Sequence, residues 1–97
     1  MKKIYISGPI TSITPEVARP IFESAEKKLT QMGFKAVNPM NNGIHPQAEW
    51  SEHMKADIKL LMDCDAILLL DDWYKSRGAR LEYNNAKELG IEIMREI

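Results

Sequence analysis

The sequence has one cysteine, no hydrophobic run of membrane-spanning length and no basic cluster beyond Lys2-Lys3. A single cysteine excludes an internal disulfide, and the acidic neighbours of Cys64, Asp63 and Asp65, argue against a reactive thiolate. We therefore expect Cys64 to be a core-facing thiol of a reducing compartment. The short apolar runs exclude a membrane-spanning helix, and the first residues do not have the pattern of a signal peptide. A cytoplasmic location is expected.

Charge and glycine patterns exclude several partners. The net charge is −1 over 97 residues and the basic residues are scattered, whereas nucleic-acid binding requires a clustered basic surface. Neither the dinucleotide-binding glycine pattern nor a P-loop is present. His45 and His53 have no partners at metal-site spacing, and Asp71-Asp72 is read as a solvated pair, with a divalent metal as the alternative. We expect no nucleic acid, membrane, metal or cofactor.

Apolar runs and helical patterns alternate along the chain, as in an α/β protein. Residues 1–97 are predicted to form a single domain. Strands are predicted at 4–6, 34–37, 66–70 and 91–94, and helices at 15–32, about 48–62 and about 76–89. This order predicts a flavodoxin-like or Rossmann-like three-layer sandwich, whose parallel sheet has about four strands in the order 2-1-3-4.

The first helix has clear boundary signals. Thr14 is the expected N-cap, Pro15 occupies the first helical position and Gly33 supplies the stop. Apolar residues at every fourth position predict its buried face: Val17, Ile21, Ala25 and Leu29.

Two carboxylates occupy positions where helical periodicity predicts burial. Glu82 shares its face with Ala79, Ala86 and Leu89, and Gly78 lies one turn earlier, leaving space for a group to approach the carboxylate. The alternative is a glutamate at the rim of the helix, with its head in solvent.

Asp57 repeats this pattern in the second helix. Its face is shared by Trp50, Met54, Leu60 and Leu61. A buried salt bridge to lysine or arginine is the alternative to a functional role. Two inward carboxylates indicate acid-base or nucleophilic chemistry, for which glycosidic bonds are a common target.

In such sheets, ligands bind beyond the carboxyl ends of the strands, at the switch point of the strand order. That end is predicted to contain Ser7-Gly8-Pro9, Asn38 and Ser76, the last being an N-cap, a ligand contact or both. Tyr5 is either a core residue or places its hydroxyl near a carboxylate.

Other residues near this end carry weaker expectations. Asp65 is expected to tie the helix–strand turn. His45 belongs to a loop and is either a lid residue or solvated. Trp73 and Tyr74 could stack on a base or cover a subunit interface.

The chain resembles the nucleoside 2-deoxyribosyltransferase-like superfamily, and especially its short branch known as DUF4406. The resemblance covers nearly the whole chain and depends on the order of several short motifs. These are Tyr5-Ile6-Ser7-Gly8-Pro9, Asn38-Pro39, Trp50, Met54-x2-Asp57, Cys64-Asp65, Ala66-Ile67-Leu68-Leu69-Leu70, Trp73, Ser76-Arg77-Gly78-Ala79-x2-Glu82 and Ala86.

The resemblance implies a role for several residues. Glu82 matches the nucleophile that attacks the anomeric carbon, and Asp57 the residue that assists the leaving base or orients the site. Tyr5 matches a contact of the nucleophile, Gly8 the turn that lines the sugar, and Ser76 a contact of a substrate hydroxyl or 5′-phosphate. The characterised relatives are longer, with C-terminal segments that complete a neighbour's active site. Residues 10–13 lack the Arg and Gly residues of the nucleotide hydrolases.

We therefore expect an enzyme that hydrolyses or transfers the N-glycosidic bond of a nucleoside or nucleotide, without a cofactor. Glu82, Asp57 and Tyr5 are the expected catalytic residues, and the expected substrate contacts are Ser7, Gly8, Pro9, Asn38, Ser76 and Gly78. The alternatives are a non-catalytic nucleotide-binding module and a structural, oligomer-forming domain. A homo-oligomer is expected in every case, because the core is small.

Overall fold

The computed structural model describes residues 1–10, 13–95 and 97. Within these residues, four strands alternate with three α-helices, and two short 3₁₀-helices follow the second and third strands. The elements are β1 (Lys3–Ser7), α1 (Pro15–Gln31), β2 (Lys35–Val37), η1 (Pro39–Asn41), α2 (Trp50–Met62), β3 (Ala66–Leu69), η2 (Trp73–Lys75), α3 (Arg77–Glu88) and β4 (Glu92–Met94). All neighbouring strands are parallel, in the order β2-β1-β3-β4. The predicted fold class and strand order are confirmed.

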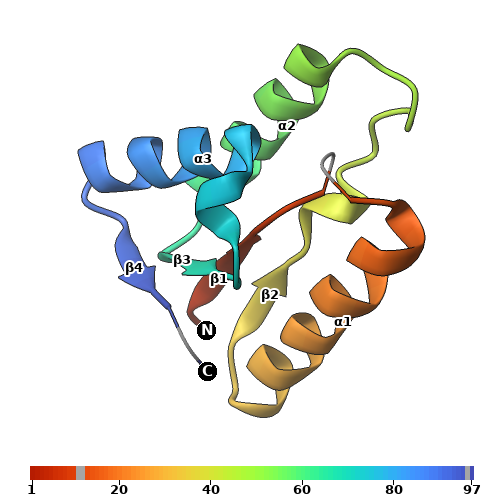
Figure 1. Ribbon diagram of the computed structural model, residues 1–97. Helices are drawn as coiled ribbons and strands as arrows, with labels where there is room; N and C mark the ends of the chain where they lie inside the picture. Colours follow the sequence, from red (N-terminus) through yellow and green to blue (C-terminus); the bar gives the residue numbers. More distant parts are fainter. Residues whose placement is uncertain (11–12, 96) are drawn as a thin grey trace.

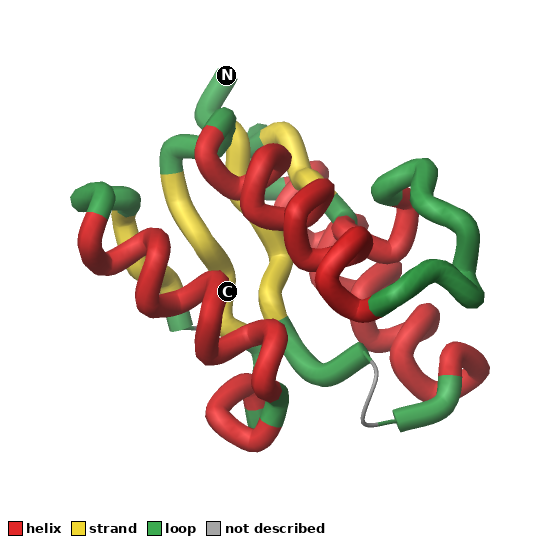
Figure 2. The backbone as a smooth tube through the Cα atoms, turned by 90° about the horizontal axis from the view of Figure 1, so that it is seen from above, coloured by secondary structure: helices red, strands yellow, loops and turns green. Residues whose placement is uncertain are grey.

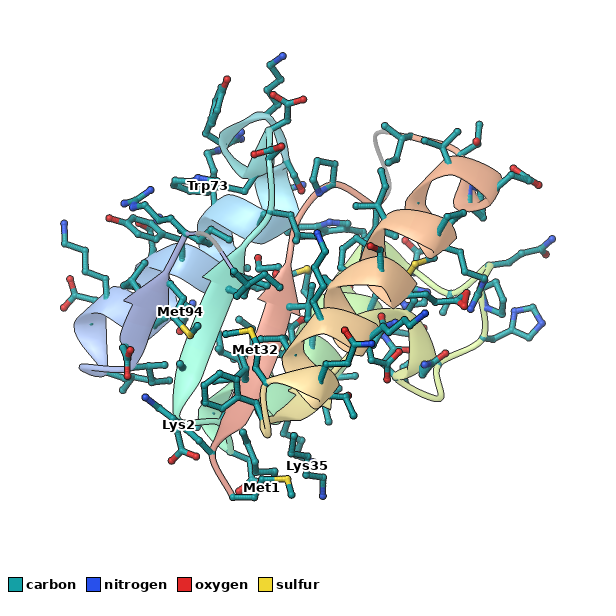
Figure 3. The ribbon with its side chains drawn as sticks, turned by 90° about the horizontal axis from the view of Figure 1, so that it is seen from below. Met1, Lys2, Met32, Lys35, Trp73 and Met94 are labelled. Carbon is teal, nitrogen blue, oxygen red and sulfur yellow. The ribbon has the colours of Figure 1, made fainter. Side chains whose placement is uncertain are left out.

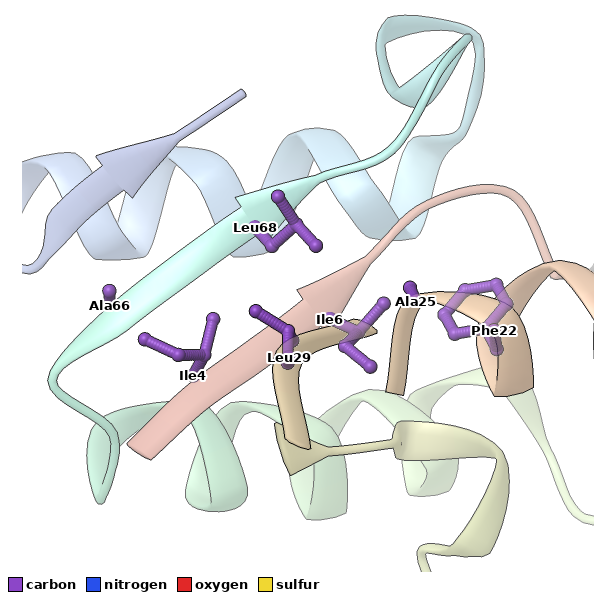
Figure 4. Packing of buried hydrophobic residues seen from close by; sticks show 7 residues of the cluster. All are labelled: Ile4, Ile6, Phe22, Ala25, Leu29, Ala66 and Leu68. Carbon is purple, nitrogen blue, oxygen red and sulfur yellow. The ribbon is translucent and has the colours of Figure 1, made fainter. Parts of the chain in front are cut away.

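The sheet is the middle layer of a sandwich, with α1 on one face and α2 and α3 on the other (Figures 1 and 2). The α1 side holds a core of Ile4, Ile6, Phe22, Ala25, Leu29, Ala66 and Leu68 (Figure 4). The opposite side holds a second core of Tyr5, Leu61, Cys64, Ile67, Leu69 and Ala86. Because side chains alternate along a strand, β1 contributes Ile4 and Ile6 to one core and Tyr5 to the other.

The buried face of α1 differs from the predicted one. Ala25 and Leu29 are buried as expected, but Val17 and Ile21 are 53% and 47% exposed. The buried stripe consists of Ala18, Phe22, Ala25 and Leu29. A strict four-residue repeat drifts by about 40° per step around a helix of 3.6 residues per turn, so its first members leave the face that its last members share.

The ends of α1 explain how the chain enters and leaves it. Pro15 begins the helix and Gly33, at φ +88°, follows its end, as predicted. The Thr14 side chain makes no capping hydrogen bond; its backbone carbonyl accepts from the N–H of Ala18 at 2.9 Å. Thr14 therefore caps through its extended backbone alone.

The second half of the chain follows the predicted plan with small shifts at the boundaries. The helix predicted from about residue 48 begins at Trp50. Cys64 is buried, and burial raises the pKa of its thiol to about 11. Asp65 was expected to tie the helix–strand turn; its carboxylate instead accepts from the Lys3 N–H at 2.8 Å, which ties the start of β3 to β1.

The strands all end at one edge of the sheet. Trp73 lies near that edge, whereas Lys2 and Lys35 lie at the opposite one (Figure 3). None of the helices in the described ranges has both the length and the apolar content to cross a membrane.

Candidate active site

Glu82 points inward from α3, as the periodicity predicts. It is only 4% exposed, and it shares the buried face of α3 with Ala79 and Ala86. Leu89 is 57% exposed because it caps the C-terminal end of α3, past the last turn that packs on the sheet. The Ser76 hydroxyl caps the other end by accepting from the N–H of Ala79 at 3.2 Å. This cap fixes the first turn of the helix that carries Glu82.

Two hydroxyl groups of β1 hold the Glu82 carboxylate. Tyr5 donates to Oε2 at an O···O distance of 2.5 Å, and Ser7 donates to Oε1 at 2.7 Å. Tyr5 is fully buried and therefore fulfils both expected roles, as a core residue and as a partner of a carboxylate. Because both oxygens are bonded to one strand, the orientation of the carboxylate is fixed by the sheet.

The environment of Glu82 shifts its titration towards neutral pH. Burial raises the pKa of the carboxyl to about 7, and the negative charge of Asp57 acts in the same direction. The hydrogen bonds from Tyr5 and Ser7 lower this pKa, because they stabilise the charged form. The Tyr5 pKa is raised well above 10, mainly by burial and then by the charge of Glu82. Tyr5 is thus a hydrogen-bond donor at all physiological pH values.

Asp57 is the second buried carboxylate and lies on the same side of the sheet. It is 6% exposed, on the face of α2 that also buries Met54 and Leu61. In the described part of the chain it pairs with no lysine or arginine; instead, the Asn42 amide donates to its Oδ1 at 2.9 Å. Burial raises the pKa of Asp57, whereas the Asn42 hydrogen bond and the nearby His53 lower it. The salt-bridge alternative is therefore wrong.

The N-terminal halves of α2 and α3 are held close together. A Cβ on Gly78 would lie 3.1 Å from the Met54 sulfur and 3.8 Å from the Trp50 ring nitrogen. The Arg77 guanidinium lies 3.9 Å from the centre of the Trp50 ring. The missing side chain of Gly78 therefore allows α2 to pack closely on α3. The sequence had predicted that this space would let another group approach Glu82.

The structure separates the other predicted contact residues. Gly8 allows a close approach to Leu70, because a Cβ at this position would lie 3.0 Å from the Leu70 Cβ. Pro9 lines a groove of about 830 Å³ beside α1. The Asn38 amide caps η1 through the Met40 N–H and donates to Glu26 of α1 at 3.4 Å. Asn38 thus bonds to the α1 layer, whereas the carboxylates lie in the layer of α2 and α3.

Two neighbours of Asp57 were missed from the sequence. Asn42 contacts both Asp57 and His53, with 3.2 Å between its Nδ2 and the His53 Nδ1. In the sequence Asn42 is part of Asn41-Asn42-Gly43, which signals only a turn. The spacing of His53 and Asp57, four residues apart on one helix, was the available signal for that pair.

The remaining candidates have ordinary surroundings. Trp73 packs on Tyr83 with 4.7 Å between ring centres, whereas Tyr74 is 57% exposed. His45 is exposed and accepts from the Gln47 N–H. Asp72 pairs with Lys75 at 3.6 Å. Among the described residues, no three His, Cys, Asp or Glu side chains are grouped so that they could hold a metal ion.

Comparison with known proteins places the chain in a family. The family model of DUF4406, a domain of unknown function, matches residues 2–95. No curated protein matches the sequence. A solved structure described as a 2-desoxiribosyltransferase from Leishmania mexicana is 20% identical, with a TM-score of 0.75; the match covers 98% of this chain and 63% of that one. This chain thus spans less than two thirds of that relative.

A second solved structure has the same fold. It is a 2-deoxyribosyltransferase from the psychrotolerant bacterium Bacillus psychrosaccharolyticus, 22% identical with a TM-score of 0.71, and the match covers 98% of this chain and 75% of that one. The chain therefore belongs to the DUF4406 family and has the fold of the 2-deoxyribosyltransferases.

Proposed function

We propose that the protein cleaves or transfers the N-glycosidic bond of a nucleoside or nucleotide, with Glu82 as the nucleophile. The observation that carries this proposal is the Glu82 carboxylate, buried and held by hydroxyl groups on both oxygens, with Asp57 in the same layer. The fold of the 2-deoxyribosyltransferases supports the substrate class.

The chemistry follows from the two carboxylates. An oxygen of Glu82 attacks the anomeric carbon, and the bond from that carbon to the base nitrogen breaks with its electron pair leaving on the base. Asp57 supplies a proton to the base or orients it. Water then attacks the glycosyl ester to give hydrolysis, or a second base attacks to give transfer; either releases the Glu82 carboxylate. Negative charge beside the anomeric carbon stabilises the oxocarbenium-like transition state.

The hydroxyl donors suit this role. Each carboxylate oxygen accepts one hydrogen bond from β1 and retains acceptor capacity for a substrate. The pKa of about 7 leaves a substantial fraction of Glu82 ionised at neutral pH, as a nucleophile requires. The expected substrate contacts by Ser7, Gly8, Pro9, Asn38, Ser76 and Gly78 stay predictions.

Base release from a panel of nucleosides and nucleotides tests the proposal. Glu82→Ala and Glu82→Gln are expected to abolish release. Glu88→Ala, at an exposed glutamate of the same helix, is the matched control and should release base as the wild type does. Equal release by wild type and Glu82→Ala contradicts the proposal.

The second candidate is a nucleotide-binding module without turnover. The near-complete burial of Glu82 favours it, and neither the groove beside α1 nor a hollow of about 320 Å³ between α2 and α3 includes this residue. Stabilisation by a nucleotide against heat, without base release, selects this candidate. A purely structural domain would show neither effect.

Self-association and a cytoplasmic location stay predictions. Exposed apolar side chains are present on both helical layers, at Val17 and Ile21 of α1 and at Met62 of α2. Sedimentation of the purified protein over a range of concentrations measures self-association directly.

A further inference from the structure

The amide of Asn42 is held in one orientation by its own turn. Asn42 follows η1 and is partly buried. It begins the segment of residues 42–49 that connects η1 to α2; Figure 1 shows the course of this segment. Its Oδ1 accepts from the N–H of Ile44 at 2.9 Å, two residues along the chain. This local turn uses the amide oxygen, so the NH₂ group faces away from the turn and towards α2.

That NH₂ group lies against two polar side chains of α2. Nδ2 lies 2.9 Å from Asp57 Oδ1 and 3.2 Å from His53 Nδ1. Because an amide nitrogen only donates, the contact with His53 is a hydrogen bond in the tautomer that carries its hydrogen on Nε2. One side chain thus joins a turn, a histidine and a buried carboxylate.

We propose that Asn42 is a positioning residue of this site, which holds the orientation and the charge of Asp57 and acts on Glu82 only through that carboxylate. A catalytic role of Asn42 rests on the proposed function. Its effect on the carboxylates of the substrate-free protein does not, and can be measured whether or not the protein is an enzyme.

The charges around the two carboxylates give the direction of the effect. The titratable groups that act on Asp57 and Glu82 are His53 of α2 and Tyr5 of β1, besides the two carboxylates themselves. The Asn42 hydrogen bond lowers the pKa of Asp57, and the charge of Asp57 raises the pKa of Glu82. Without Asn42, the charged form of Asp57 loses a hydrogen bond, so the pKa of Asp57 is expected to rise.

The experiment is a carbon-13 NMR titration of the carboxyl groups in the substrate-free protein, with the Asp57 signal assigned by its absence in Asp57→Asn and the Glu82 signal by its absence in Glu82→Gln. Asn42→Ala is expected to move the Asp57 midpoint to higher pH. In the Asp57→Asn background, Asn42→Ala is expected to leave the Glu82 midpoint unchanged. Asn42→Ser keeps a hydroxyl that can accept from Ile44 but is too short to reach Asp57, and serves if Asn42→Ala does not fold.

Several results would overturn the inference. An unchanged or lowered Asp57 midpoint in Asn42→Ala or Asn42→Ser does so, as does a shift of the Glu82 midpoint by Asn42→Ala in the Asp57→Asn background. Asn41→Ala is the matched control, because Asn41 is the exposed neighbour in the same segment; a similar shift there would assign the effect to the segment as a whole. Failure to detect base release would contradict the proposed function and leave this titration valid.

Discussion

Tyr5 of the central strand β1 donates a hydrogen bond to Glu82 of α3 across the buried interface between sheet and helix, at 2.5 Å between the two oxygens. The two residues are 77 positions apart in the sequence. The packing of α3 on the sheet therefore brings the proposed nucleophile to its donor. Substitution of either residue is therefore expected to change the pKa of the other.

Tyr5→Phe is expected to raise the pKa of Glu82 above its value of about 7, because the lost hydrogen bond stabilises the charged carboxylate. The rising limb of the pH dependence of kcat/KM should move to higher pH, and so should the NMR titration of Glu82. Tyr83→Phe is the control, because Tyr83 lies on the same helix and packs on Trp73. An unshifted midpoint in Tyr5→Phe would contradict the expectation.

The stability of the fold should fall as pH rises through the titration of Glu82. The carboxyl has a pKa of about 7 when folded, against 4.5 for an unperturbed glutamate, so the folded state holds its proton over this interval while the unfolded state loses it. The stabilisation is complete below the lower pKa and lost above the higher one. At about 1.4 kcal/mol for each pH unit, the loss amounts to about 3 kcal/mol.

Denaturant unfolding between about pH 4 and pH 9 measures this loss in the wild type and in Glu82→Gln. The variant has no such titration, so the difference in unfolding free energy between the two proteins should change over that interval. Asp57, whose pKa is also raised, remains in both proteins and cancels in the comparison. A constant difference across the range would rule out the raised Glu82 pKa.

Two glycines should respond differently to alanine. At Gly8 the added Cβ meets the Leu70 Cβ at 3.0 Å, an atom fixed to its own backbone, so Gly8→Ala is expected to destabilise by about 1–3 kcal/mol. At Gly78 it meets the flexible Met54 thioether at 3.1 Å, and alanine gains up to about 1 kcal/mol in helix propensity. Gly78→Ala is expected to be nearly neutral. Thermal unfolding of the two variants measures both effects. Equal losses of stability would contradict the expectation, because they would mean that the Met54 side chain moves aside no more easily than the Leu70 Cβ.

The two helix caps form a second matched pair. Ser76→Ala removes the hydrogen bond to the Ala79 N–H and is expected to destabilise by about 1 kcal/mol. Thr14→Ala removes a side chain that makes no capping bond and should have little effect. If the two variants unfold at the same denaturant concentration, the side-chain cap at Ser76 contributes nothing measurable.

The sequence predicted the sheet and the two carboxylates because both depend on local patterns. Apolar runs define the strands, and the inward positions of Asp57 and Glu82 follow from the helix period. The face of α1 was misplaced because Val17 and Ile21 fit a four-residue repeat that a helix does not keep.

Partners distant in sequence were harder to predict. Asn42 has the composition signal of a turn, and its role depends on where that turn lies relative to α2, which no local pattern encodes. Asn38 was expected at the carboxyl ends of the strands; it does follow β2, but its side chain bonds to Glu26 in the layer of α1, a contact that no local pattern predicts. The space beside Gly78 was predicted to be open to a group approaching Glu82. Met54 of another helix occupies it, and this contact too is not encoded in a local pattern.

The alternation of β1 has a practical consequence for engineering. Ile4 and Ile6 pack with α1, whereas Tyr5 and Ser7 hold Glu82 on the other side. The α1 layer can therefore be redesigned for heat resistance without touching a residue that contacts either carboxylate. A library restricted to Phe22, Leu29 and the exposed Val17 and Ile21 would vary stability while keeping the hydrogen bonds of the site unchanged.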